Sequence, residues 1–82
     1  MAKALGIIMH SRNEHARAAQ LLTESVRKKD KDPETFYYLG LSLLQLNRKG
    51  EAVMALEKSL DLDDKTPYAI KALQALTLAR TP

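Results

Sequence analysis

The sequence predicts an all-α fold of about five helices, arranged as a stack of antiparallel helical hairpins. Three observations lead to this prediction. Leu and Ala are abundant among the 82 residues, whereas Gly and Pro occur three times each, a composition that favours helix over strand. The sequence also contains an internal repeat, in which residue n matches residue n+34. Within each repeat, apolar residues recur at the spacing of one helix face. Because the chain is short, we expect a single domain over residues 1–82.

The internal repeat relates residues 1–32 to residues 33–66 and continues into residues 67–82. Gly, Asn and Pro match between repeats as well as Leu and Ala, which argues against a coincidence of composition. The identical pairs are Leu5 and Leu39, Gly6 and Gly40, Asn13 and Asn47, Ala18 and Ala52, Leu22 and Leu56, Ser25 and Ser59, Asp30 and Asp64, Lys31 and Lys65, and Pro33 and Pro67.

Local signals divide each repeat into two helices. Asp32 and Thr66 are capping residues, and each stands before a Pro that suits the first position of a helix. The segment Ser11–Glu14 is typical of a capping box before a second helix. A break at 47–50 marks the same place in the next repeat. We therefore expect helices near residues 2–10, 13–28, 33–46, 50–61 and 67–79.

This pattern resembles the tetratricopeptide (TPR) repeat family, whose unit is a helical hairpin of about 34 residues. The repeat over 33–66 carries the resemblance through Phe36, Leu39, Gly40, Leu43, Ala52, Leu56 and Ser59. The repeat over 1–32 is weaker, with Ala2 at the aromatic position, and 67–82 resembles a single first helix, with Gln74 in place of Gly. The resemblance implies a right-handed stack of hairpins, a TPR-like α-solenoid that binds other proteins.

Small residues explain how such hairpins pack. Gly6 and Gly40 allow neighbouring helices to approach closely, and Ala18 and Ala52 do the same from the second helix of each hairpin. We expect the residues Leu39, Leu43, Ala52, Leu56 and Leu60 to be buried. A single hairpin cannot bury its apolar face, so stacking stabilises the array.

Charge and composition narrow the classes of function. The net charge is +3, but residues 33–66 carry more acidic than basic groups, so no continuous basic stripe is evident. A small helical nucleic-acid-binding domain, using basic residues such as those in Arg27–Lys31, is the alternative to protein binding. Cysteine is absent, which removes disulfides and fits a cytoplasmic protein. We expect no membrane span and no signal peptide.

The sequence offers no convincing catalytic or metal site. His10 and His15 lie five residues apart across a predicted helix break, without Cys beside them, which does not match the spacing of zinc ligands on one helix face. Ser11 next to His10 has no third group or oxyanion donor to complete a nucleophilic site. The acidic turn after residue 60 lacks the Gly and Glu of a calcium loop. We expect neither enzymatic activity nor a cofactor.

The resemblance implies a binding surface on the first helix of each hairpin, which lines the concave face of TPR proteins. Mapped through the repeat, this surface contains Lys3, Ile7, His10, Tyr37, Tyr38, Leu41, Leu44, Gln45, Lys71 and Ala75. We expect the peptide-binding residues to be Tyr37, Tyr38, Leu41, Leu44, Gln45 and Lys71. Tyr37 and Leu41 replace the Lys and Asn that hold a carboxylate in some families, so an apolar or amphipathic helix is the expected ligand. The alternative is that Tyr37, Leu41 and Leu44 are core or oligomer contacts.

The last predicted helix indicates self-association. It is apolar around most of its circumference, and a helix of this kind is usually buried on more than one side. We expect an oligomer, most simply a symmetric dimer, with an interface that contains Ile70, Leu73 and Leu76. The same pattern also fits a fragment of a longer repeat array, in which a following helix would cover this face.

Overall fold

A computed structural model describes residues 2–80, in which five α-helices follow one another and no strand occurs. They are α1 (Ala2–Ser11), α2 (His15–Lys28), α3 (Pro33–Gln45), α4 (Lys49–Leu62) and α5 (Ala69–Arg80). The all-α prediction is confirmed, and every helix boundary lies within two residues of the predicted one.

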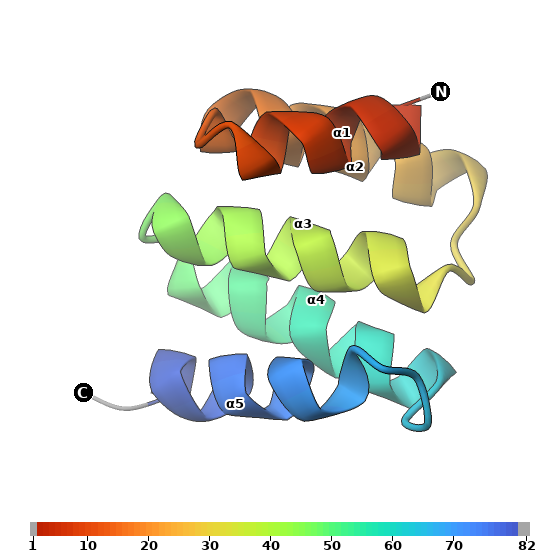
Figure 1. Ribbon diagram of the computed structural model, residues 1–82. Coiled ribbons are helices and arrows are strands. Elements are labelled where there is room, and N and C mark those ends of the chain that lie inside the picture. The colour runs from red at the N-terminus through yellow and green to blue at the C-terminus, as the bar shows by residue number, and fades with distance from the viewer. Residues whose placement is uncertain (1, 81–82) are drawn as a thin grey trace.

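The helices form two layers (Figure 1). In that view α1, α3 and α5 lie side by side in front, with α3 in the middle, and α2 and α4 lie behind them. Each helix packs on the next one along the chain, and α3 also contacts both α1 and α5. Within residues 2–80, no backbone contact joins α2 to α4. The middle helix, α3, is therefore the element around which the others are arranged.

The two hairpins, α1–α2 and α3–α4, share the same backbone turn. Asn13 and Asn47 occupy equivalent positions in the repeat and adopt left-handed φ angles of 63° and 61°, which Asn tolerates better than most residues. Each turn ends its first helix with a pair of hydrogen bonds typical of a left-handed helix cap. The longer bond of each pair runs from the amide of Glu14 to the carbonyl of Met9, and from Arg48 to Leu43, both at 2.9 Å.

This turn corrects the predicted capping box at Ser11–Glu14. The Ser11 hydroxyl donates to the Ile8 carbonyl at 2.8 Å, so it continues α1 and does not cap α2. Glu14 stands at the N-cap of α2 without a side-chain cap. The left-handed residue Asn13 must precede α2, which is why the helix begins at His15 and not at residue 13.

The two glycines lie where the helices of each hairpin meet. A Cβ atom added to Gly6 would lie 2.7 Å from the Leu22 side chain, and one added to Gly40 would lie 2.6 Å from the Leu56 side chain. Both distances are too short for a real side chain, so the predicted close approach is confirmed in both hairpins. The contact of the first hairpin thus recurs at the equivalent position of the second.

The starts of α3 and α5 differ although the repeat gives both a Pro. Asp32 caps α3 as predicted, accepting hydrogen bonds from the amides of Glu34 and Thr35. Thr66 accepts a hydrogen bond from the Tyr68 amide at 3.2 Å, and its carbonyl accepts one from Ala69. These bonds form a turn over Pro67, so α5 begins at Ala69, two residues later than predicted.

The core consists of two connected clusters of apolar side chains. The first lies between α2, α3 and α4 and includes Leu22, Leu39 and Leu43. The second lies between α3, α4 and α5 around Leu56. Of the five residues predicted to be buried, Leu60 is only half-buried at the edge of the second cluster. No helix within residues 2–80 is long and apolar enough to cross a membrane.

Candidate functional site

The surface predicted to bind a ligand is the front face, formed by α1, α3 and α5 (Figure 1). A row of aromatic rings crosses it from the end of α1 to the start of α5. The Tyr38 ring lies in the middle, with its centroid 5.7 Å from that of His10 and 5.0 Å from that of Tyr37. Tyr37 stacks on Tyr68 at 5.5 Å. Such pairs add specific packing energy beyond area burial, so the rings join the three front helices.

The six predicted peptide-binding residues are not equally accessible. Tyr37 is 7% exposed and packs in the second core cluster, so the core interpretation describes it better than a ligand contact. Tyr38, Leu41 and Leu44 are half-buried and pack against the same cluster. Gln45 and Lys71 are exposed. A ligand on the front face would therefore touch the outer parts of Tyr38, Leu41 and Leu44, with Gln45 and Lys71 at its border.

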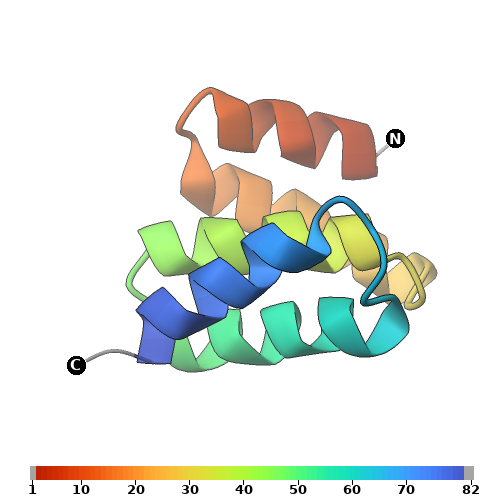
Figure 2. The ribbon, with the colours of Figure 1, turned by 60° about the horizontal axis from the view of Figure 1, so that its bottom comes forward.

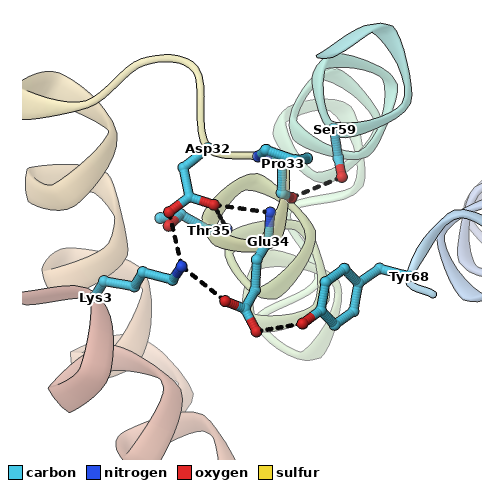
Figure 3. Close-up of polar contacts among 7 residues, drawn as sticks. All are labelled: Lys3, Asp32, Pro33, Glu34, Thr35, Ser59 and Tyr68. Atoms are coloured by element: carbon cyan, nitrogen blue, oxygen red, sulfur yellow. Dashed lines mark hydrogen bonds and ion pairs between the residues drawn. The ribbon is translucent and has the colours of Figure 1, made fainter. Parts of the chain in front are cut away.

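A polar network holds one end of the front face together (Figure 3). The Lys3 ammonium of α1 lies 2.8 Å from the Asp32 carboxylate and 2.7 Å from that of Glu34. The Tyr68 hydroxyl donates to the other Glu34 oxygen at 2.6 Å. Ser59 of α4 donates to the Pro33 carbonyl at 2.7 Å. The start of α3 is thus linked to α1, α4 and the segment before α5.

This network moves the pKa values of its members in the directions that stabilise the ion pairs. Burial by itself would lower the pKa of Lys3, but its hydrogen bonds to Asp32 and Glu34 outweigh burial and raise it. Burial likewise opposes ionisation of Asp32, yet the bond to Lys3 keeps the pKa of that carboxyl below its usual value. The pKa of Glu34 is lowered chiefly by Lys3 and then by Tyr68. Lys3, which the repeat maps to the predicted binding surface, is already paired within the chain.

His10 of α1 also makes an internal contact. Its Nδ1 lies 3.1 Å from the hydroxyl of Ser42, which is fully buried in α3. The His15 ring packs edge-on against it with centroids 5.2 Å apart. Burial, and then the proximity of His15, lower the pKa of His10 below its usual value. His10 therefore links α1 to α3.

The predicted oligomer interface divides into exposed and buried parts. Ile70 and Leu73 are 69% and 55% exposed, whereas Leu76 is 4% exposed and packs in the second core cluster. A strip of alanines, which includes Ala72 and Ala75, also faces inward. Figure 2 shows α5 crossing in front of α3 and α4, with no helix over its outer side. Leu78, which the prediction omitted, is 72% exposed on this outer side.

Of the residues considered for other chemistry, His10 and His15 do come together, with ring centroids 5.2 Å apart. No group of three His, Asp or Glu side chains that could hold a metal ion occurs within residues 2–80. The basic segment Arg27–Lys31 covers the last two residues of α2 and the exposed turn that leads to α3, and Lys28 pairs with Glu24 at 3.7 Å. This basic segment contributes no side chain to the polar network of the front face.

Sequence reasoning missed the roles of Asp32, Glu34 and Tyr68 in the front-face network. The Asp-Pro-Glu segment was recognised only as a helix start, because local patterns do not reveal that Lys3 reaches it from another helix. Comparison of the chain with protein-family models, with curated proteins and with solved structures finds no match.

Proposed function

We propose that this chain is a TPR-like module that binds and scaffolds other proteins and catalyses no reaction. The observation that carries the proposal is the recurrence, at equivalent positions of the two repeats, of both the hairpin turn at Asn13 and Asn47 and the helix contact at Gly6 and Gly40. A helical hairpin repeated at this interval is the defining feature of a TPR array. In this interpretation the hairpins form a right-handed solenoid, and α5 is the first helix of a third unit.

The absence of catalysis is proposed from the pairs that come closest to a reactive site. His10 and Ser42 lie at the distance expected of a base and a nucleophile. Ser42, however, has no exposed surface, so a substrate cannot reach its hydroxyl. The other serine near His10, Ser11, donates its hydrogen bond to a backbone carbonyl of its own helix.

The proposed ligand is an apolar or amphipathic helix that lies on the front face over Tyr38, Leu41 and Leu44. These three side chains present partly exposed apolar surface, and helices that bind in grooves use apolar contacts at intervals of three or four residues. Gln45 and Lys71 supply polar contacts at the border. Because Tyr37 is buried, it serves to position Tyr38 beside it.

The test of this function is capture of partners by the immobilised domain from a lysate of the cells that make it. The variant Leu41→Glu/Lys71→Glu changes the front face while leaving the buried Tyr37 in place. We expect it to lose the captured proteins and to keep the helical circular-dichroism spectrum of the wild type. A control variant, Lys29→Glu/Lys31→Glu, changes two exposed cations in the α2–α3 turn. It should still capture the same proteins as the wild type. If both variants capture the same proteins as the wild type, the front face is not the binding surface.

Self-association through α5 is the second part of the proposal. Its outer side exposes Ile70, Leu73 and Leu78, and burying each of these against a second copy would contribute roughly 1.5–3 kcal/mol before the costs of association. Sedimentation should show a dimer of the wild type and a monomer of Ile70→Glu/Leu73→Glu. Leu76 is left unchanged because it is buried within the chain. A wild-type monomer at high micromolar concentration would contradict this part of the proposal.

A further inference from the structure

A second hollow lies on the side of the molecule opposite the front face. Its walls are the rear helices α2 and α4, and its floor is α3. It exists because α2 and α4 each pack on α3 but make no backbone contact with each other. We refer to this hollow, between Arg17 and Arg27 on one wall and Met54 and Lys58 on the other, as the rear groove.

The floor of the rear groove is apolar. It contains Phe36, Leu39 and Leu43 of α3, and Ala19 and Ala55 border it from the two walls. Above this floor Met54 is 71% exposed, which is costly for an apolar side chain that remains in water. A ligand in the rear groove would cover this side chain and the floor together.

The size of the groove indicates the kind of ligand. Its volume is about 1560 Å³, larger than the roughly 300–1,000 Å³ of a typical small-molecule pocket. Both walls are helices of 14 residues, each about 21 Å long. A groove of this length and with helical walls fits a polypeptide helix of about four turns.

The charges on the walls are unbalanced. The groove is lined by four cations, Arg17, Arg27, Arg48 and Lys58, and by two anions, Glu24 and Glu51. Both anions are already paired, Glu51 with Arg48 and Glu24 with Lys28 outside the groove. Within residues 2–80, Arg17, Arg27 and Lys58 have no acidic partner in an ion pair. The groove therefore combines an apolar floor with unpaired positive charge on both walls.

From these features we propose that the rear groove binds an amphipathic helix of a partner protein, with apolar residues on one side and acidic residues flanking them. The apolar side would lie on the half-buried Phe36 and on the exposed Met54, above Leu39 and Leu43, which are 6% and 7% exposed. The acidic residues would meet Arg17 and Arg27 on one wall and Lys58 on the other. This site lies on the opposite layer from Tyr38 and Leu41, so it stands independently of the proposed front-face function.

A second copy of this chain fits the rear groove less well. The exposed apolar sides of its own end helices lie near cations, since Arg12 stands four residues after Ile8, just beyond α1, and Lys71 is next to Ile70. Placing either helix in the rear groove would bring these cations towards those of the walls, and like charges in an interface suppress association. The acidic helix of a different protein is complementary to the same walls.

The probe that tests this proposal is a designed peptide of 14 residues, the length of each wall helix. It carries Leu along one side and Glu on both flanks, and a side-chain lactam keeps it helical. Its matched control has Lys at every Glu position. We expect the acidic peptide to bind in a fluorescence-anisotropy titration and the basic peptide to bind at least about tenfold more weakly. Affinity for the acidic peptide should fall as salt is added.

Two variants separate the groove from general attraction to positive charge. Arg17→Glu/Arg27→Glu reverses two exposed cations of the groove, and Lys29→Glu/Lys31→Glu reverses two exposed cations outside it. Both change the net charge equally. Binding of the acidic peptide should weaken about tenfold in the groove variant and by less than about twofold in the turn variant. Equal weakening in both variants would overturn the proposal.

The place of binding is read independently from methionine methyl groups labelled with ¹³C. Met54 lines the rear groove, whereas Met9 packs partly buried on the first core cluster. We expect the Met54 methyl signal to shift with the acidic peptide while that of Met9 stays in place. The proposal is overturned if neither peptide binds, or if binding leaves Met54 unchanged and is lost in Leu41→Glu of the front face.

Discussion

Three leucines stand at equivalent positions in successive repeats, and their surroundings differ. Leu39 in the middle unit is 6% exposed, whereas Leu5 before it and Leu73 after it are 44% and 55% exposed. Leu39 lies on the rear side of α3, where both rear helices, α2 and α4, pack against the helix. Of the two rear helices, α1, which carries Leu5, contacts α2 alone, and α5, which carries Leu73, contacts α4 alone. A leucine at this repeat position is therefore buried when rear helices flank it on both sides and exposed when only one does.

Contacts inside a hairpin do not vary in this way. Ala18 and Ala52 are both fully buried, as are Leu22 and Leu56. Each leucine lies against the glycine of its own hairpin and also packs against the helix that follows, α3 for Leu22 and α5 for Leu56. The comparison therefore separates two kinds of burial. One needs only the helix that follows the hairpin, which is present in both cases, and the other needs a rear helix on each side.

The largest effect should come from truncating the leucine that has both neighbours. Leu39→Ala should lower the free energy of unfolding by about 2–4 kcal/mol, because it leaves a cavity among buried side chains. Leu5→Ala and Leu73→Ala should cost less than about 1 kcal/mol each, since these residues are partly exposed already. Urea denaturation of the three variants provides the measurement. Equal losses for all three would contradict the comparison of middle and end units.

The next largest loss of stability should come from replacing the two interhelical glycines with Ala. Gly40→Ala would bring a Cβ to 2.6 Å from Leu56 and 3.3 Å from the backbone carbonyl of Ala52, and overpacking of this kind costs about 1–3 kcal/mol. Gly6→Ala should cost somewhat less because its close neighbours are side-chain atoms alone.

Gly50→Ala is the control for these two variants. Nothing lies within 4 Å of the added Cβ, and Ala has a higher helix propensity than Gly. We expect it to raise the thermal midpoint slightly while the other two lower it. A gain in stability for Gly40→Ala would show that Leu56 moves aside easily.

Substitutions at the two hairpin turns should lower the stability less, and by similar amounts in the two turns. Replacing Asn13 or Asn47 with Ala places an ordinary residue at a left-handed φ, at a cost of about 1 kcal/mol. Glycine at either position should be tolerated or slightly stabilising. Because the turns have the same hydrogen bonds, thermal unfolding should give similar losses for the two Ala variants. A large difference between the two Ala variants would show that the turns differ in energy although their backbones are alike.

The smallest expected effect is a dependence of the folding stability on pH, which arises in the first hairpin and not in the second. The pKa of His10 is lowered in the folded chain from 6.5, so protonation favours the unfolded state. Stability should be full above pH 6.5 and should fall as the pH drops from there through the folded pKa. The residue at the equivalent position of the next repeat is Leu44, which does not titrate.

Chemical denaturation at pH 7 and pH 5 measures this dependence. We expect His10→Leu, which copies the residue of the second hairpin, to reduce the loss of stability between the two values. An undiminished loss would show that His10 is not the source of the dependence.

Local patterns were sufficient to predict the number, order and approximate ends of the helices, and the close approach at Gly6 and Gly40. Each of these properties depends on residues near in sequence or on the internal repeat. The helix starts at His15 and Ala69 were missed by two residues, because a left-handed turn at Asn13 and a turn over Pro67 displaced the expected caps.

The candidate site was only partly predictable for a different reason. The row of residues on the front helices follows from the repeat, but the burial of Tyr37 and Leu76 depends on how α5 packs against α3 and α4. The pairing of Lys3 with Asp32 and Glu34 joins residues about thirty positions apart. The sequence by itself determined the helices and their hairpins, since turn chemistry and apolar spacing act locally. Tertiary packing alone decided which faces remain open to a partner, because each face is covered or left exposed by helices that are distant along the chain.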